Sequence, residues 1–148
     1  MTTSAIEGFF GLDLWFAAAG HFVILAASFQ VPYRLSWKKD LQHLMPFNRK
    51  LLWVQSGFTV ITIVAFGTLT LVLQAELLRG DRAAMGLAAF IGAYWTARVI
   101  VDGVYFSHAD WPKGKHFVIG HALLTTLFCF LAVSYWSLFV WNVWVRNR

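Results

Sequence analysis

The sequence predicts an all-α integral membrane protein, a four-helix antiparallel bundle in one domain. Three observations predict it: the composition, four long apolar segments, and the short polar connections between them. Of the 148 residues, 59% are hydrophobic and only 13% are charged, which is too few polar groups to cover the surface of a water-soluble domain. A bilayer removes that requirement, and the eight Trp and four Tyr are typical of its two interfaces.

Four segments are long enough to cross the hydrocarbon core, which takes about 20 apolar residues in a helix. They are Phe9–Val31, Leu51–Leu73, Ala83–Phe106 and Phe117–Trp141. We expect helices, because an isolated strand would leave its backbone groups unpaired in lipid. The short connections predict that consecutive helices are antiparallel neighbours, so the whole chain (1–148) forms one transmembrane domain.

The first span is expected to stay in the mature protein. Met1–Ser4 contains no Lys or Arg, and the apolar run that follows is too long for the core of a cleavable signal peptide. Pro32 is expected to follow the end of this span.

The first connection, Tyr33–Lys50, mixes basic and apolar residues. Trp37, Leu41 and Leu44 are spaced as on one face of a helix, which predicts a short amphipathic helix in the headgroup region. This segment is interpreted as a lipid anchor, with a docking surface for a partner subunit as the alternative. Asn48 is the expected N-cap of the second span.

Basic residues in the short connections predict the orientation. The first and third connections carry seven Lys and Arg, against four on the opposite side. Both termini are therefore expected outside a bacterial inner membrane. Attraction of these connections to anionic headgroups accounts for the net charge of +5. No basic helix or aromatic platform is visible, so no nucleic-acid partner is expected.

Five polar residues form a group within the predicted spans, whereas Asp13, Gln74 and Glu76 are isolated polar residues near span ends. Threading each span at 1.5 Å per residue places the five grouped residues in the half of the bilayer nearer the first and third connections. Ionisable groups are expensive in hydrocarbon unless they pair or face a polar cavity, so we expect one shared pocket that is a candidate cofactor site. Its residues are His21, Gln55, Arg98, Asp102 and His121.

Arg98 and Asp102 are the firmest predicted pair within this cluster. At positions i and i+4 they share one helix face, so an ion pair between them is expected. Such a pair could fix the rotation of the third helix. Alternatively, it could contact an anion, a haem propionate or a quinone, or handle a proton.

His21 and His121 follow Gly20 and Gly120 on the first and last spans, which are adjacent in an antiparallel bundle. The two imidazoles could face each other as axial ligands of haem b or another tetrapyrrole. The alternative is that each histidine only hydrogen-bonds a neighbouring helix.

A metal site is a weaker hypothesis. His108 and His116, with His121 and an aspartate, would supply enough ligands, but no HExxH pattern puts two of them on one helix face.

Several function classes lack their motifs. The sequence contains no Gly-rich phosphate loop and no GxSxG, and Cys129 is its only cysteine. An enzymatic role is therefore disfavoured, although it stays undecided. Transport is disfavoured as well, since no internal repeat and no proline in the middle of a span is present.

Two hypotheses about function stay open. The first is a small non-catalytic binding or assembly subunit of a larger membrane complex, with the lipid bilayer and membrane protein subunits or further copies of itself as partners. The alternative is a haem b- or quinone-binding redox protein that uses the His/Arg/Asp cluster.

Overall fold

The computed structural model describes residues 3–106 and 114–145, which form helices, turns and coil with no strand. Four of the helices are long and apolar enough to cross a membrane. They are α1 (Thr3–Arg34), α3 (Pro46–Val72), α5 (Arg82–Tyr105) and α6 (Lys115–Val140).

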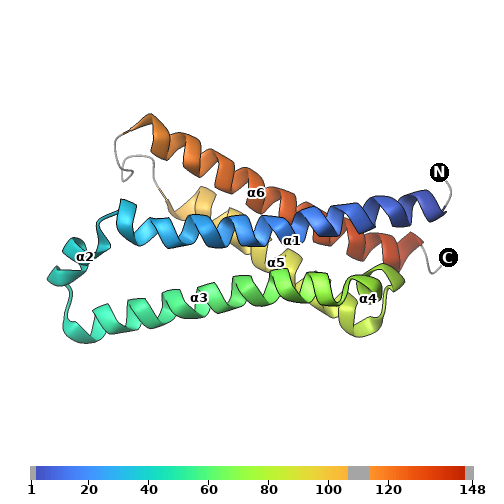
Figure 1. Cartoon of the computed structure of the whole chain (residues 1–148), viewed down its shortest axis with the longest axis horizontal. Helices are drawn as coiled ribbons and strands as arrows, with labels where there is room; N and C mark the ends of the chain where they lie inside the picture. Colours follow the sequence, from blue (N-terminus) through green and yellow to red (C-terminus); the bar gives the residue numbers. More distant parts are fainter. Residues whose placement is uncertain (1–2, 107–113, 146–148) are drawn as a thin grey trace.

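Consecutive long helices run in opposite directions (Figure 1). We call the end where α1 ends and α3 begins the loop end. The opposite end, where α1 begins and α6 ends, is the terminal end. A short helix, α4 (Gln74–Arg79), and a π-helical turn, η3 (Trp141–Val145), lie at the terminal end.

Each long helix begins before its predicted span, and α1 also ends after it, whereas α3, α5 and α6 end one residue before the predicted end. Apolar run length detects only the part of a helix that hydrocarbon would surround, whereas the backbone hydrogen bonds continue into the interface. Pro32 lies inside the last turn of α1 instead of after it. The expected cap at Asn48 is wrong, because α3 begins earlier, at Pro46, with Met45 as its N-cap. Proline is well suited to a first helical position, where its missing N–H has no partner to lose.

The first connection forms less helix than predicted. A single turn, α2 (Trp37–Asp40), changes to a 3₁₀ turn, η1 (Leu41–His43). Leu41 is buried and the Trp37 ring packs edge-on against Trp53, but Leu44 is exposed. The amphipathic helix is therefore broken after one turn.

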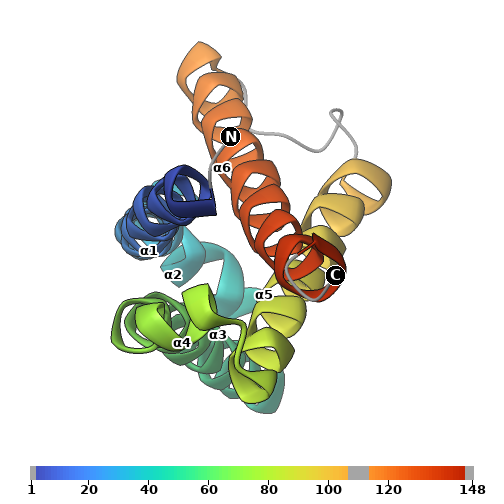
Figure 2. The ribbon, with the colours of Figure 1, turned by 90° about the vertical axis from the view of Figure 1, so that its right-hand side faces the viewer.

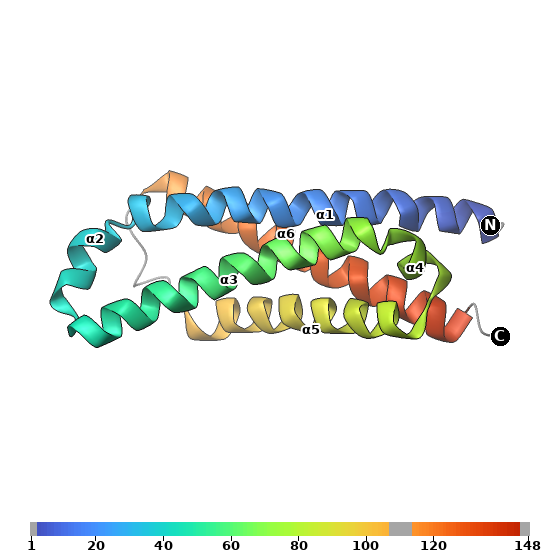
Figure 3. The ribbon, with the colours of Figure 1, turned by 60° about the horizontal axis from the view of Figure 1, so that its bottom comes forward.

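The helices pack as two pairs. α1 packs mainly on α3, and α5 packs mainly on α6. A contact between α1 and α6 joins the pairs, as the views along and across the bundle show (Figures 2 and 3).

The buried core occupies only the terminal half of the bundle. On the described parts of the long helices, no residue nearer the loop end than Ile24, Ile63, Trp95 and Phe128 is buried. The Trp95 and Phe128 rings stack at this limit, with centroids 5.1 Å apart and planes 19° apart. Beyond this layer the helices leave open space between them.

Gly80 closes the terminal end. It follows α4 in the left-handed conformation, with φ 75°, which favours glycine. The buried Asn142 of η3 packs over it and donates through Nδ2 to the carbonyl oxygens of Leu138 (3.1 Å) and Leu77 (3.4 Å). A Cβ on Gly80 would lie 2.6 Å from the Asn142 Oδ1.

Gly80→Ala is expected to lower the free energy of unfolding by about 1–2 kcal/mol, because alanine is strained at this φ and would displace Asn142. Gly86→Ala is the matched control, since nothing lies within 4 Å of a Cβ there. In the middle of a helix that change should be neutral or stabilise by up to ~1 kcal/mol. Thermal unfolding in detergent measures both, and equal melting temperatures for the two variants would contradict the packing described at Gly80.

Candidate functional site

His21 is the most enclosed of the predicted site residues. Its side chain is completely buried, and both ring nitrogens are hydrogen-bonded. Nδ1 lies 2.8 Å from the Ala17 carbonyl oxygen, and Trp95 Nε1 donates to His21 Nε2 at 3.0 Å. A carbonyl oxygen can only accept and an indole N–H can only donate, so the hydrogen is on Nδ1.

Aromatic rings from three other helices surround this imidazole. Phe66 of α3, Trp95 of α5 and Tyr135 of α6 meet it edge to face, with ring centroids 5.5–5.9 Å away. The Tyr135 hydroxyl in turn hydrogen-bonds Thr70 of α3. His21 therefore connects α1 to each of the other three long helices.

This geometry does not fit His21 and His121 as two axial ligands of one haem. A metal ligand needs a nitrogen lone pair, and that of His21 Nε2 already accepts from Trp95. In addition, His21 contacts Tyr135, which lies fourteen residues, or about 21 Å along α6, from His121. The expected facing pair is wrong: the two residues occupy different levels of the bundle.

Asp102 pairs across helices instead of with Arg98. Its Oδ2 accepts from the Thr125 hydroxyl at 2.7 Å and lies 3.1 Å from His121 Nε2, and both partners belong to α6. The predicted i,i+4 ion pair with Arg98 is therefore wrong. A shared helix face brings Arg98 and Asp102 near each other, but Thr125 and His121 of α6 are better placed to interact with the carboxylate.

Arg98 points elsewhere. Its guanidinium carbon lies 5.7 Å from the centre of the Phe128 ring, and its side chain is exposed. Within residues 3–106 and 114–145, no carboxylate lies within salt-bridge distance of it. The contact with Phe128 is a cation–π interaction at the limit of the buried core.

The other predicted residues do not join a cluster. Gln55 is exposed on α3, where its backbone oxygen accepts from Thr59. His108 lies outside the described residues, and so does the side chain of His116. In the part of the chain that the structure describes, no three His, Cys, Asp or Glu side chains are grouped so that they could hold a metal ion. The single pocket expected from the sequence is thus divided among separate places.

Two polar contacts that the sequence did not predict lie in the terminal half. Ser134 of α6 donates to Asp13 of α1 at 3.0 Å, and the Gln74 amide donates to the Gly11 carbonyl oxygen at 2.9 Å. In the sequence, Asp13 and Gln74 look like isolated polar groups near span ends. Because both lie near the terminal end of their predicted spans, the sequence could have indicated that polar contacts form in that half.

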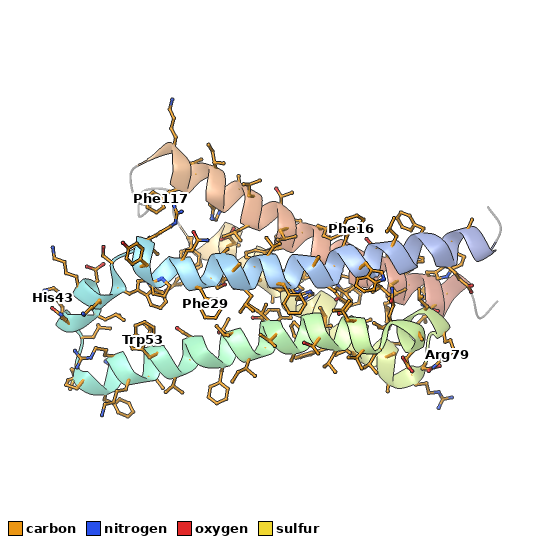
Figure 4. The ribbon with its side chains drawn as sticks, viewed as in Figure 1. Phe16, Phe29, His43, Trp53, Arg79 and Phe117 are labelled. Atoms are coloured by element: carbon orange, nitrogen blue, oxygen red, sulfur yellow. The ribbon has the colours of Figure 1, made fainter. Side chains whose placement is uncertain are left out.

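Two clefts open in the loop half, on either side of α1. The aromatic cleft, about 480 Å³, lies between α1, α3 and α5 and is lined by Arg98 together with Trp37, Trp53, Tyr94 and Trp95. The α1–α6 groove, about 510 Å³, lies between the two helices that name it and is lined by His121 and mostly apolar residues. Phe29 and Trp53 lie toward this end in Figure 4, whereas Arg79 lies at the other.

Comparison with protein-family models, curated proteins and solved structures finds no match for this chain. The function therefore has to be inferred from the clefts and the paired polar groups.

Double-mutant cycles test which residue Asp102 interacts with. We expect His121→Ala and Asp102→Ala to be coupled by about 1 kcal/mol, because each removes the other's partner at a partly exposed site. Arg98→Ala and Asp102→Ala should be additive within roughly 0.3 kcal/mol. The free energies of unfolding in mixed micelles give both values, and a larger coupling to Arg98 than to His121 would contradict the geometry.

Proposed function

We propose that this protein is a non-catalytic subunit of a larger membrane complex, built as an antiparallel bundle of four transmembrane helices. In this proposal the α1–α6 groove receives a transmembrane helix of another subunit. The observation that carries it is this groove, which is lined mostly by apolar side chains and lies beside a terminal half with a buried core.

The surface of the helices supports placement in a bilayer. Large apolar side chains are exposed on every long helix, among them Phe16, Phe58, Phe90 and Val133. Water would penalise such a surface, whereas lipid does not. The basic residues of the first connection favour an orientation with the loop end in the cytoplasm and both termini outside, in a bacterial inner membrane.

The groove has the features that helix association in lipid requires. Association there depends on close packing and interhelical hydrogen bonds, and small residues allow the backbones to approach. Ala27 of α1 and Gly120 of α6 line the groove, and nothing lies within 4 Å of a Cβ built on Gly120. Leu123, Leu124 and Leu127 supply the apolar wall.

Polar groups at the edge of the groove supply specificity. Gln30, Arg34 and His121 line it, and Arg34 Nε donates to Gln30 Oε1 at 3.2 Å. A partner helix with a polar residue at this level would find donors and acceptors there, and such bonds add to packing within lipid.

The internal polar groups support a binding role more than a catalytic one. Among the described residues, no buried side-chain nitrogen or oxygen lacks a hydrogen-bond partner. His21, Thr70 and Ser134 are used in contacts between helices, so no reactive group is held ready in the core. The redox alternative is less well supported, because His21 Nε2 already accepts a hydrogen bond and cannot form a ligand pair with His121.

Gly120→Trp is expected to weaken assembly about tenfold or more, equivalent to ~1.4 kcal/mol, because the indole obstructs the close approach of a helix at this small residue. Gly103→Trp is the matched control: Gly103 is exposed on α5, outside both clefts, and has open space at its Cβ. Each variant is expressed in the source membrane, solubilised in mild detergent and measured by native mass spectrometry.

The wild-type chain and the Gly103 variant should be detected mainly in a complex with other chains. The Gly120 variant should be detected mainly as the single chain. A wild-type chain that is alone under these conditions would contradict the proposal, as would a complex that the Gly120 variant retains. If the mass of the complex is a multiple of the mass of the single chain, the helix in the groove belongs to a second copy of this chain and not to another subunit.

A further inference from the structure

The aromatic cleft contains a cation that the described structure leaves without an anion. Among the described residues that line the cleft, Arg98 is the only Lys or Arg. It lies seven residues, or about 10 Å, before the end of α5. A guanidinium at that depth needs a partner or a path to the headgroups. The Phe128 ring provides only a weak contact.

The aliphatic hydroxyl groups of the cleft wall already donate their hydrogens. Ser28 and Ser56 each donate to a carbonyl oxygen of their own helix at 2.8 Å, and Thr59 does so at 3.1 Å. The remaining wall is mostly apolar, with Ile24, Phe29 and other aliphatic and aromatic side chains. The cleft therefore combines one cationic donor with a surface suited to hydrocarbon.

Part of the cleft wall belongs to the first connection, which is expected at the level of the lipid headgroups. Trp37 and Trp53, whose ring centroids are 5.9 Å apart, line the cleft, and tryptophan favours the membrane interface. The connection beside them is strongly basic. Its cations are Arg34, Lys38, Lys39, Arg49 and Lys50, and Asp40 is its only acidic residue. Such a segment attracts anionic lipids.

We infer that the aromatic cleft binds an acidic phospholipid, with the lipid phosphate on Arg98 and an acyl chain along the apolar wall. Arginine is suited to this role because its planar fork of donors matches phosphate oxygens. Charge complementarity favours a lipid over a partner's carboxylate, since the positive charge extends along the whole interfacial connection and is not confined to one position. This site is separate from the α1–α6 groove and does not depend on a subunit binding there.

The test compares two lipids that differ in headgroup charge. The protein in detergent micelles is titrated with phosphatidylglycerol or with phosphatidylcholine of identical acyl chains, and native mass spectrometry counts the lipids retained. We expect the wild type to prefer phosphatidylglycerol about tenfold. Arg98→Gln should abolish the preference, while Arg82→Gln, an exposed cation at the opposite end of the same helix, should keep it.

A second variant tests the cleft itself. Gly57 lines it and has nothing within 4 Å of a Cβ, so the larger side chain of Gly57→Leu has room to begin there and reduces the space in the cleft. We expect this variant to retain less of both lipids, with an unchanged thermal unfolding transition. Undiminished binding by a folded Gly57→Leu protein would show that the lipids lie elsewhere.

Equal retention of the two lipids by the wild type would overturn the inference, and so would a phosphatidylglycerol preference that survives Arg98→Gln. If Arg98→Gln breaks the membrane complex but leaves the lipid preference intact, the anion is a carboxylate of a partner protein and the lipid site is wrong. Gly120→Trp affects only the groove, so failure of the subunit proposal is observed separately from failure of the lipid site.

Discussion

The hydrogen bond from the Trp95 indole to His21 is the contact on which the closed half of the bundle depends. A buried imidazole without partners would cost about 1–3 kcal/mol for each group left unsatisfied. Here the Ala17 carbonyl oxygen and the indole N–H satisfy both nitrogens. They fix the orientation of the ring and the register of α1 against α5. The edges of Phe66 and Tyr135 then bring α3 and α6 to the same side chain.

The layer of side chains around His21 and Trp95 also marks where the buried core ends and the two clefts begin. Trp95 stacks on Phe128, and Arg98 follows about one turn later on α5. A guanidinium in a closed apolar core would require a desolvated ion pair, which seldom repays its desolvation. Toward the loop end the long helices therefore have no buried residues in the described structure, and the two clefts lie on either side of α1. Tight packing and open binding surface are thus divided between the two halves.

The sequence predicted where helices and residues lie along the bundle axis better than it predicted which way each side chain faces. Run length located the four long helices because about 20 consecutive apolar residues are what a helix needs to cross hydrocarbon. Depth threading, however, cannot give helix rotation. His21 and His121 were expected to face each other, yet His21 contacts α6 at Tyr135, fourteen residues away from His121. The spacing of Arg98 and Asp102 predicted a shared face but could not show that Thr125 and His121 compete for the carboxylate. Trp95 gave no signal, because a tryptophan in an apolar span looks the same whether it faces lipid or a buried histidine.

The tautomer of His21 is directly measurable. NMR of the protein in micelles, with ¹⁵N in the histidine rings and the signal assigned by His21→Phe, distinguishes a protonated ring nitrogen from one that accepts a hydrogen bond. We expect a hydrogen on Nδ1 and an accepting Nε2, whose resonance moves in Trp95→Phe and stays in place in Trp15→Phe, an exposed tryptophan on α1. A hydrogen on Nε2, or an Nε2 resonance that ignores the loss of the Trp95 indole, would contradict the central role assigned to this contact.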